Sequence, residues 1–231
     1  MSLVLRVGVI FINILVLLCS HKCMAASSLL IDAGHSPKSP GATSCTGKSE
    51  YLYNSALSEC IFSYLKERGR TVFMTRQVGD EISLIDRASM SRKAALFLSI
   101  HHDSVQPQFI RWTNKRPSST KAAGYSIFVS KKNRDYKKSL IFARRLGVAL
   151  QKRGLMPSQH HGEKIVGENR QIIDSKLGIY HHDDLIVLKH AEVPSVLLEA
   201  AVIVNPKDEV KASSKSYQRS VAEAVEMMLA I

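Results

Sequence analysis

Apolar residues gather in short runs along the chain, and three of these runs are followed by polar side chains that can bind a metal or carry a proton. The runs cover residues 29–33, 96–100 and 196–198, and the polar side chains that follow are those of His35, His101 and Glu199. Short apolar runs bounded by polar residues are typical of buried strands. Because ligands bind beyond the carboxyl ends of strands in open α/β sheets, we expect these three side chains to meet at one edge of a sheet.

Longer segments with apolar residues at helical spacing alternate with the short runs. Predicted helices cover residues 50–68, 83–93, 134–153 and 214–230, and a further short helix is expected within 168–177. Predicted strands cover 28–33, 71–75, 95–100, 124–129, 185–188 and 194–200, and loops are expected over 36–49 and 104–123. This alternation predicts an α/β fold, a three-layer sandwich in which helices flank a mostly parallel sheet of roughly six strands. We interpret residues 26–231 as one domain.

The first 25 residues have the pattern of a secretory signal peptide. Arg6 precedes an apolar run, and small residues at Ala25 and Ala26 match the position that a signal peptidase cleaves. The run is short for a membrane-spanning helix, so we expect export to the periplasm or secretion, without stable membrane insertion after cleavage. An uncleaved anchor is the alternative.

Two cysteines, Cys45 and Cys60, lie beyond the signal segment. Export makes a disulfide chemically feasible. Spacing alone does not fix the geometry, so a Cys45–Cys60 bridge and two unpaired thiols both remain open.

The chain carries a formal charge of +12, and Arg6 and Lys22 in the signal segment account for two of these charges. A basic exported protein suits an anionic partner such as a cell-wall polymer. Nucleic acid is disfavoured, because no nucleic-acid-binding motif and no stripe of aromatic and basic residues is present. A solvated basic surface is the simpler alternative.

His35 and His101 follow predicted strands, and Glu50 opens the helix after the first strand. Two histidines, one carboxylate and an open fourth position make a catalytic zinc arrangement. The alternative is that both histidines form hydrogen bonds with solvent and that Glu50 only stabilises the helix through its favourable interaction with the helix dipole. Because side chains alternate along a strand, His102 is expected to point away from such a metal and Asp103 to point back, where it can orient a ligand. His102 as a ligand remains open.

Glu199 lies within an apolar strand, and burying its carboxylate costs several kcal/mol unless it is paired or belongs to a site. Such surroundings are expected to raise its pKa, which suits a group that takes a proton from water and returns it to a leaving amine. The alternative is an ion pair with Arg76 or Lys189.

Several motifs occur in an order that resembles the zinc-dependent N-acetylmuramoyl-L-alanine amidases, the amidase-3 type of cell-wall hydrolase. The motifs are residues 31–35, 40–42, Glu50 with Asn54, 75–76, Arg87, 98–101, 187–189, 194–199 and 205–206. The resemblance implies that residues 26–231 form an amidase catalytic domain that binds Zn²⁺ through His35, Glu50 and His101 and uses Glu199 as the catalytic carboxylate. It implies hydrolysis of the amide between N-acetylmuramic acid and L-alanine of peptidoglycan. Asn54, Arg87 and Asp103 are expected to bind substrate or to orient ligands. The sequence departs from the family at His102-Asp103, where Ala-Asn is frequent, and at Ser36-Pro37-Lys38, which replaces glycines.

Two other functions remain open: another zinc peptidase of the carboxypeptidase kind, and a peptidoglycan-binding protein without activity. We expect a monomer. The histidine pairs at 160–161 and 181–182 are interpreted as surface or substrate-groove residues rather than as a second metal site.

Overall fold

The computed structural model describes residues 28–77 and 79–230, and a seven-stranded sheet in the order β2-β1-β3-β9-β6-β8-β7 runs through its middle. Its strands are β1 (Leu29–Ala33), β2 (Val72–Met74), β3 (Leu96–Asp103), β6 (Ser126–Val129), β7 (Ile172–Asp174), β8 (Ile179–His181) and β9 (Ser195–Val202). Neighbouring strands are parallel except at the β6–β9 and β7–β8 pairs. The predicted, mostly parallel α/β sheet is confirmed, with one strand more than expected.

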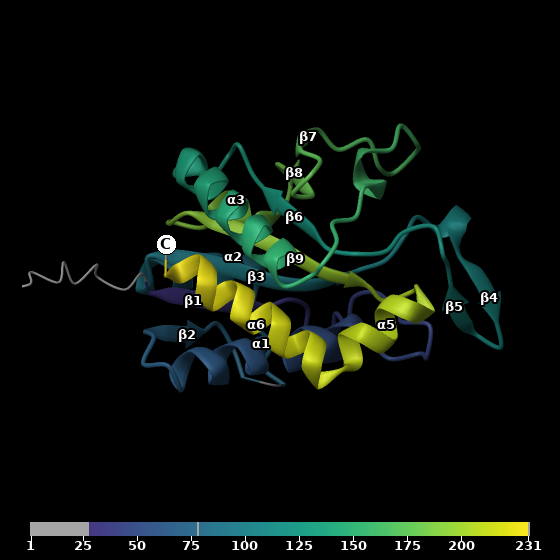
Figure 1. The fold of residues 1–231 in the computed structure, drawn as a ribbon, viewed down its shortest axis with the longest axis horizontal. Helices are drawn as coiled ribbons and strands as arrows, with labels where there is room; N and C mark the ends of the chain where they lie inside the picture. Colours follow the sequence, from purple (N-terminus) through teal and green to yellow (C-terminus); the bar gives the residue numbers. More distant parts are fainter. Residues whose placement is uncertain (1–27, 78, 231) are drawn as a thin grey trace, which may run out of the picture.

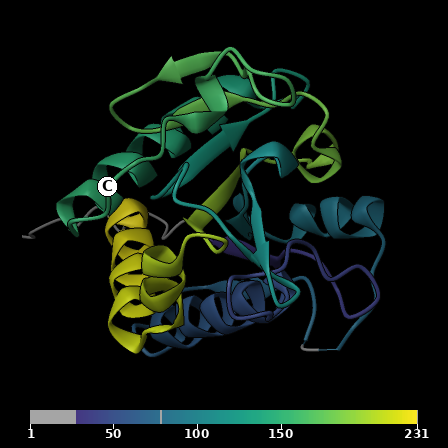
Figure 2. The same cartoon turned by 90° about the vertical axis from the view of Figure 1, so that its right-hand side faces the viewer.

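Helices cover both faces of this sheet, which confirms the three-layer arrangement (Figures 1 and 2). The helices are α1 (Glu50–Lys66), α2 (Leu84–Ser89), α3 (Tyr136–Lys152), α4 (Ile186–His190), α5 (Pro206–Ser213) and α6 (Lys215–Leu229), with single turns η1 (Met90–Lys93), η2 (Pro107–Phe109) and η3 (His160–Gly162). The helices α1, α3 and α6 pack against one face, and α2 and α4 pack against each other on the opposite face.

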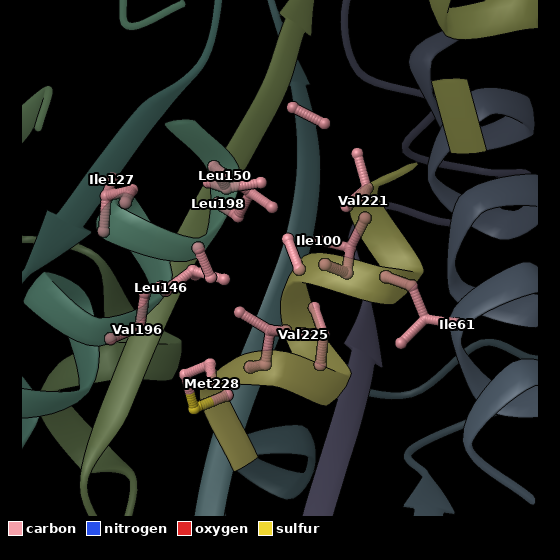
Figure 3. Close-up of a cluster of buried hydrophobic side chains, with 14 of the residues drawn as sticks. Ile61, Ile100, Ile127, Leu146, Leu150, Val196, Leu198, Val221, Val225 and Met228 are labelled. Atoms are coloured by element: carbon pink, nitrogen blue, oxygen red, sulfur yellow. The ribbon is translucent and has the colours of Figure 1, made fainter. Parts of the chain in front are cut away.

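Alternate residues of each central strand serve the two faces. Leu29 and Ile31 point into the core beneath α1, whereas Leu30 joins the core beneath α4. Figure 3 shows the larger core, where the β6 residue Ile127, Ile100 of β3 and two β9 residues, Val196 and Leu198, meet helical side chains, namely Ile61, Leu146, Leu150, Val221, Val225 and Met228. Each such aliphatic side chain contributes about 1.5–3 kcal/mol when fully buried, so the strands that carry the site residues stand on a well-packed base.

Two predicted elements are wrong in type. Residues 185–188 were expected as a strand and instead lead into α4, whose Val187 and Leu188 are buried against the sheet. A four-residue apolar run fits a strand and a buried helical turn equally well, so periodicity alone does not distinguish the two structures. Residues 168–177 were expected as a helix and instead contain β7, which pairs with β8 as an antiparallel hairpin. The backbone of Asn169 has φ of 68°, a left-handed conformation that a helix cannot contain.

The strands β4 (Arg111–Thr113), β5 (Arg116–Ser118) and β8 and the helix α5 were not predicted. The expected loop at 104–123 contains β4 and β5, an antiparallel hairpin that projects from one end of the molecule (Figure 1). Asn205 caps α5 by accepting a hydrogen bond from the Lys207 amide. The predicted signal segment, residues 1–25, lies outside the described residues. Within the described part of the chain, no helix is long and apolar enough to cross a membrane.

Candidate metal centre and active site

Three of the predicted site residues, His35, Glu50 and His101, come together at the carboxyl edge of the sheet, and we call them the first cluster. One oxygen of the Glu50 carboxylate, Oε2, lies 3.0 Å from His35 Nε2, and the other, Oε1, lies 3.0 Å from His101 Nδ1. One ligand atom from each residue lies within 4.8 Å of the others. Two imidazole nitrogens and a carboxylate are a donor set that zinc accepts, so these residues fit the metal that the sequence predicted.

The backbone leaves room for this cluster at two glycines. A Cβ on Gly34 would lie 2.4 Å from His101 Nε2, and a Cβ on Gly41 would lie 2.4 Å from Glu50 Oε2. Gly41 also has φ of 76°, a conformation that glycine adopts without strain. The loop between β1 and α1 therefore folds tightly enough to place Glu50 beside the two strand ends.

A backbone contact fixes how His35 faces Glu50. His35 Nδ1 lies 3.0 Å from the carbonyl oxygen of Ser39, so Nδ1 carries the proton and donates it. The Nε2 atom lies 3.0 Å from Oε2 of the Glu50 carboxylate. A ring nitrogen and a carboxylate oxygen at this distance hold either a proton or a metal ion between them, so the contact is compatible with a bound cation.

Glu50 is ionised in this setting. Burial opposes its charge, but hydrogen bonds from His101 and His35 and their positive charges hold its pKa well below the usual range. Glu50 Oε1 also accepts hydrogen bonds from Asn54 Nδ2 at 3.0 Å and from the His102 amide at 3.2 Å. Asn54 thus contacts a cluster residue directly.

His102 points away from the first cluster, as strand alternation predicts. Its Nδ1 lies 2.8 Å from Asn54 Oδ1, and the residue is buried. Burial lowers the pKa of His102 to about 4, so the ring is neutral at pH 7 and donates to Asn54. His102 holds Asn54, and Asn54 in turn holds Glu50.

Arg87 and Asp103 lie away from the three cluster side chains. Arg87 is buried and donates to both oxygens of Asp32, at 2.7 and 2.6 Å. Asp32 belongs to β1, so this pair secures the strand that leads to His35. Asp103 points instead toward His160 and His161.

Glu199 stands next to His101 in the sheet, because the two residues are register partners in the parallel β3–β9 pair. Its Oε2 atom is buried and has no hydrogen-bond partner among the described residues. Burial raises the pKa of Glu199 well above its usual value, and the negative charges of Asp103 and Glu50 raise it further, in the direction expected from the sequence.

Neither of the alternative partners, Arg76 and Lys189, forms an ion pair with Glu199 among the described residues. Arg76 donates through Nε to the Ala33 carbonyl at 3.0 Å and through Nη2 to the Gly34 carbonyl at 3.1 Å. Lys189 is exposed on α4. Glu199 instead lines a cavity of about 230 Å³ together with Asp103, Phe128, His161 and Arg170.

The sequence predicted that His160 and His161 lie at the surface or in a substrate groove. The surface location is wrong, because both residues are buried. His160 is 4% exposed and His161 is 8% exposed. His161 Nδ1 lies 2.9 Å from Glu168 Oε2, a residue that the sequence did not single out. The only sequence feature that pointed to this region was the pair of adjacent histidines in a polar segment, and it did not indicate that Glu168 contacts His161. His181 and His182 are half-buried, with His181 Nε2 2.5 Å from the Tyr136 hydroxyl.

Cys45 and Cys60 are free thiols, so the bridge between them is absent from the described structure. Cys45 Sγ lies 2.5 Å from Glu209 Oε2 on α5. Burial, with the hydrogen bond to this carboxylate, raises the pKa of Cys45 to about 12, so the thiol stays protonated and donates.

Comparison with known proteins gives a consistent family. A family model described as N-acetylmuramoyl-L-alanine amidase matches residues 29–230. A probable cell wall amidase LytH from Staphylococcus saprophyticus is 29% identical over 206 residues, which are 88% of this chain and 57% of that protein. The N-acetylmuramoyl-L-alanine amidase AmiC from Neisseria meningitidis is 27% identical over 209 residues, 85% of this chain and 50% of that protein. The chain thus spans about half the length of these relatives.

Solved structures share the fold. The N-acetylmuramyl-L-alanine amidase Ami1 from Mycobacterium smegmatis superposes with a TM-score of 0.70 at 19% identity, over 89% of this chain and 96% of that one. The catalytic domain of CwlV, an N-acetylmuramoyl-L-alanine amidase from Bacillus (Paenibacillus) polymyxa var. colistinus, gives 0.65 at 23% identity, over 87% and 95%. Because the family model matches nearly all of the described residues, this chain belongs to the N-acetylmuramoyl-L-alanine amidase family.

Proposed function

We propose that this protein is a zinc-dependent amidase that cleaves the bond between the lactyl group of N-acetylmuramic acid and L-alanine of the peptidoglycan stem peptide. Membership of the family supports the reaction class. The first cluster supports zinc, because its donors are two imidazole nitrogens and a carboxylate oxygen whose atoms converge. When bound, zinc would polarise the scissile carbonyl and lower the pKa of a water molecule toward neutral pH.

Within this proposal His35, Glu50 and His101 hold the metal. The Ser39 carbonyl keeps the His35 proton on Nδ1, so Nε2 is free to bind. Asn54 holds Glu50 through Oε1, and His102 holds Asn54. The ligands therefore keep their orientation without help from the substrate.

Glu199 is the proton carrier. It accepts a proton from the attacking water and donates it to the nitrogen of the leaving L-alanine, so the carboxylate is regenerated after each turnover. A raised pKa suits the second step, because a carboxylic acid of higher pKa retains the proton until the amine takes it. Asp103 and Glu50 contribute to that pKa through their charge.

One observation carries the proposal: Glu199 is the register partner of His101, so the candidate proton carrier and a candidate ligand lie side by side on one sheet edge. An ionisable group with no hydrogen-bond partner among the described residues is poorly placed for a purely structural role.

Mass analysis of digested muropeptides tests the reaction. We expect free stem peptides whose amino terminus is L-alanine, whereas stems shortened at the carboxyl end would indicate a carboxypeptidase. Glu199→Gln is expected to retain zinc and lose about 10²–10⁴-fold in rate. Glu67→Gln is the matched control, because the Glu67 side chain is 69% exposed. Wild-type turnover by Glu199→Gln would contradict the role of Glu199, and a wild-type protein that binds zinc but releases no stem peptides would contradict the proposed reaction.

We further propose that the protein is exported to the periplasm or secreted and acts there as a monomer on peptidoglycan. The basic composition and the pattern of residues 1–25 support this location. Amino-terminal sequencing of the protein from extracytoplasmic fractions is expected to begin at residue 26 or 27. A protein that retains residue 1 in the cytoplasm would contradict export.

A further inference from the structure

Two histidines and a carboxylate also meet outside the first cluster, and we call Asp103, His160 and His161 the second cluster. Asp103 ends β3, and the two histidines open the turn η3. Asp103 Oδ2 lies 3.2 Å from His160 Nε2 and 2.8 Å from His161 Nε2. One ligand atom from each residue lies within 4.8 Å of the others.

The outer nitrogens of both histidines have partners. His160 Nδ1 lies 2.7 Å from the Ser158 hydroxyl, and His161 Nδ1 lies 2.9 Å from Glu168 Oε2. Gln106 Nε2 donates to the other oxygen of Glu168 at 3.0 Å. Metal-binding histidines are oriented in this way, with one nitrogen on a polar partner and the other free for the ion. In both rings the nitrogen that faces Asp103 is Nε2, and in His161 this nitrogen lies within hydrogen-bond distance of Asp103 Oδ2, at 2.8 Å.

Hydrogen bonds within the protein satisfy only part of this cluster. A protonated His161 would donate to Asp103 and to Glu168 without any ion. His160 Nε2 is different, because it is buried, in a residue only 4% exposed, and has no hydrogen-bond partner among residues 28–77 and 79–230. Although Asp103 Oδ2 is 3.2 Å away, the contact does not satisfy this nitrogen. His160 Nε2 is thus a buried ring nitrogen that faces a carboxylate without a hydrogen bond, and an ion between the two groups would satisfy both of them.

We propose that Asp103, His160 and His161 form a second site for a divalent transition-metal ion, with Oδ2 and the two Nε2 atoms as its ligands. Two imidazole nitrogens select zinc and its neighbours over magnesium and calcium, which prefer oxygen ligands. Asp103 and His161 line the cavity of about 230 Å³ that Glu199 also lines, so two of the three proposed ligands border this cavity. The second cluster shares no ligand with the first, so the proposal does not depend on amidase activity.

Zinc content measures the proposal directly. Tag-free full-length protein is stripped with a chelator, loaded with zinc alone and passed through a desalting column before metal analysis. We expect two zinc ions per wild-type chain, one in His160→Asn, one in His35→Ala and none in the double variant. His181→Asn is the matched control and keeps two, because His181 bonds to Tyr136 and Gln171 and not to the cluster.

The outcomes separate this proposal from the proposed function. If the wild type holds one ion, His35→Ala holds none and His160→Asn holds one, the second site is refuted and the first stands. If His35→Ala holds one and His160→Asn holds none, the second site stands and the metal role of the first cluster fails. Two ions in both the wild type and His160→Asn would also refute the second site.

The proposal can be tested even if His160→Asn fails to fold. The wild type and His35→Ala already decide it, because His35→Ala without zinc refutes the second site. Ser158→Ala gives an independent variant, since it removes only the hydroxyl at His160 Nδ1. We expect about 10–100-fold weaker zinc binding at one of two sites, measured by titration against a competing chelator, with an unchanged circular dichroism spectrum. Wild-type affinity at both sites in Ser158→Ala would refute the role of His160.

Discussion

The two histidine–carboxylate clusters have the same donor types but are built from different parts of the chain. The first cluster stands on two strand ends and the first turn of α1, and Gly34 and Gly41 clear the space around it. The second combines the end of β3 with η3, which belongs to the long segment between α3 and β7. The sheet register therefore decides where the first cluster lies, and a loop decides where the second lies.

The supporting contacts differ in the same way. Backbone groups hold much of the first cluster: the Ser39 carbonyl at His35, and the amides of Ala42 and His102 at Glu50. Side chains hold the second, through Ser158 and Glu168. Backbone support survives most substitutions, whereas side-chain support is lost with a single one. We therefore expect the first cluster to be sensitive to its ligands and glycines, and the second to be sensitive to its outer partners.

The largest expected effect is that of Glu50→Gln. Replacing the carboxylate that faces both histidines removes the charge that attracts a cation, so zinc affinity at the first cluster is expected to fall by more than about 100-fold, beyond the loss from an outer partner. Amidase activity is expected to disappear with it. Chelator-competition titration checks affinity, and Glu67→Gln is again the exposed control. Full activity without zinc in Glu50→Gln would show that the first cluster is not the metal centre.

Gly34→Ala and Gly162→Ala compare the space around the two clusters. A Cβ at Gly34 would lie 2.4 Å from His101 Nε2, so the ring has to leave its position. A Cβ at Gly162 would meet Ile172 Cδ1 at 2.5 Å, the far end of a flexible side chain that can move aside. We expect Gly34→Ala to weaken zinc binding at the first cluster by about 100-fold and Gly162→Ala to leave the second within about 3-fold, since rotamer changes cost little. Equal losses of zinc affinity in the two variants would show that the two clusters do not differ in the space that surrounds them.

Asn54→Ala and Glu168→Gln compare the outer partners. Asn54 donates to Glu50 Oε1 beside several other donors, whereas Glu168 is the partner of His161 Nδ1. Loss of such partners costs about 10–100-fold in metal affinity, and we expect Glu168→Gln to lie at the upper end and Asn54→Ala at the lower. Titration of each variant in the background that lacks the other site measures this. The reverse order would show that backbone contacts do not support the first cluster.

The same contrast explains what the sequence predicted. His35, His101 and Glu199 follow apolar runs, and because parallel strands end at a common edge of the sheet, the sequence alone predicts that these side chains lie close together. Glu50 depended on the path of the 36–49 loop, which periodicity does not describe. The structure supplies that path through Gly41, the Ala42 amide and the hydrogen bond from the Cys45 amide to the Ile203 carbonyl.

The second cluster was beyond pattern analysis for a physical reason. His160 and Asp103 are 57 positions apart in the sequence, and their contact depends on a segment with no period. The same segment contains residues 168–177, where a helix was expected and the structure has β7, so the position of Glu168 was not predicted correctly from the sequence. Strand ends can be predicted from local patterns, whereas loops that fold back onto a sheet are placed by tertiary contacts.

The smallest expected effect concerns Glu209, which anchors the loop of the first cluster and has no counterpart in the second. Its carboxylate accepts hydrogen bonds from the Tyr53 hydroxyl, the Thr46 hydroxyl and the Cys45 thiol, each at 2.5 Å. Burial opposes its ionisation, but these bonds lower its pKa to about 2. We expect Glu209→Gln to reduce the free energy of unfolding at pH 7 by about 1–3 kcal/mol, since charged hydrogen bonds are lost.

The pH dependence of that loss has a definite sign. A folded-state pKa of about 2 lies below the usual value of 4.5, so the carboxylate stabilises the fold fully above about pH 5 and progressively less as the pH falls toward 2. The stability difference between wild type and Glu209→Gln, measured by urea unfolding, is expected to shrink over that interval. Zinc affinity is expected to fall at the first cluster alone, because Glu209 holds the residues that lead into Glu50. A difference that stays constant from pH 7 to pH 3 would mean that the charge of Glu209 does not anchor the loop.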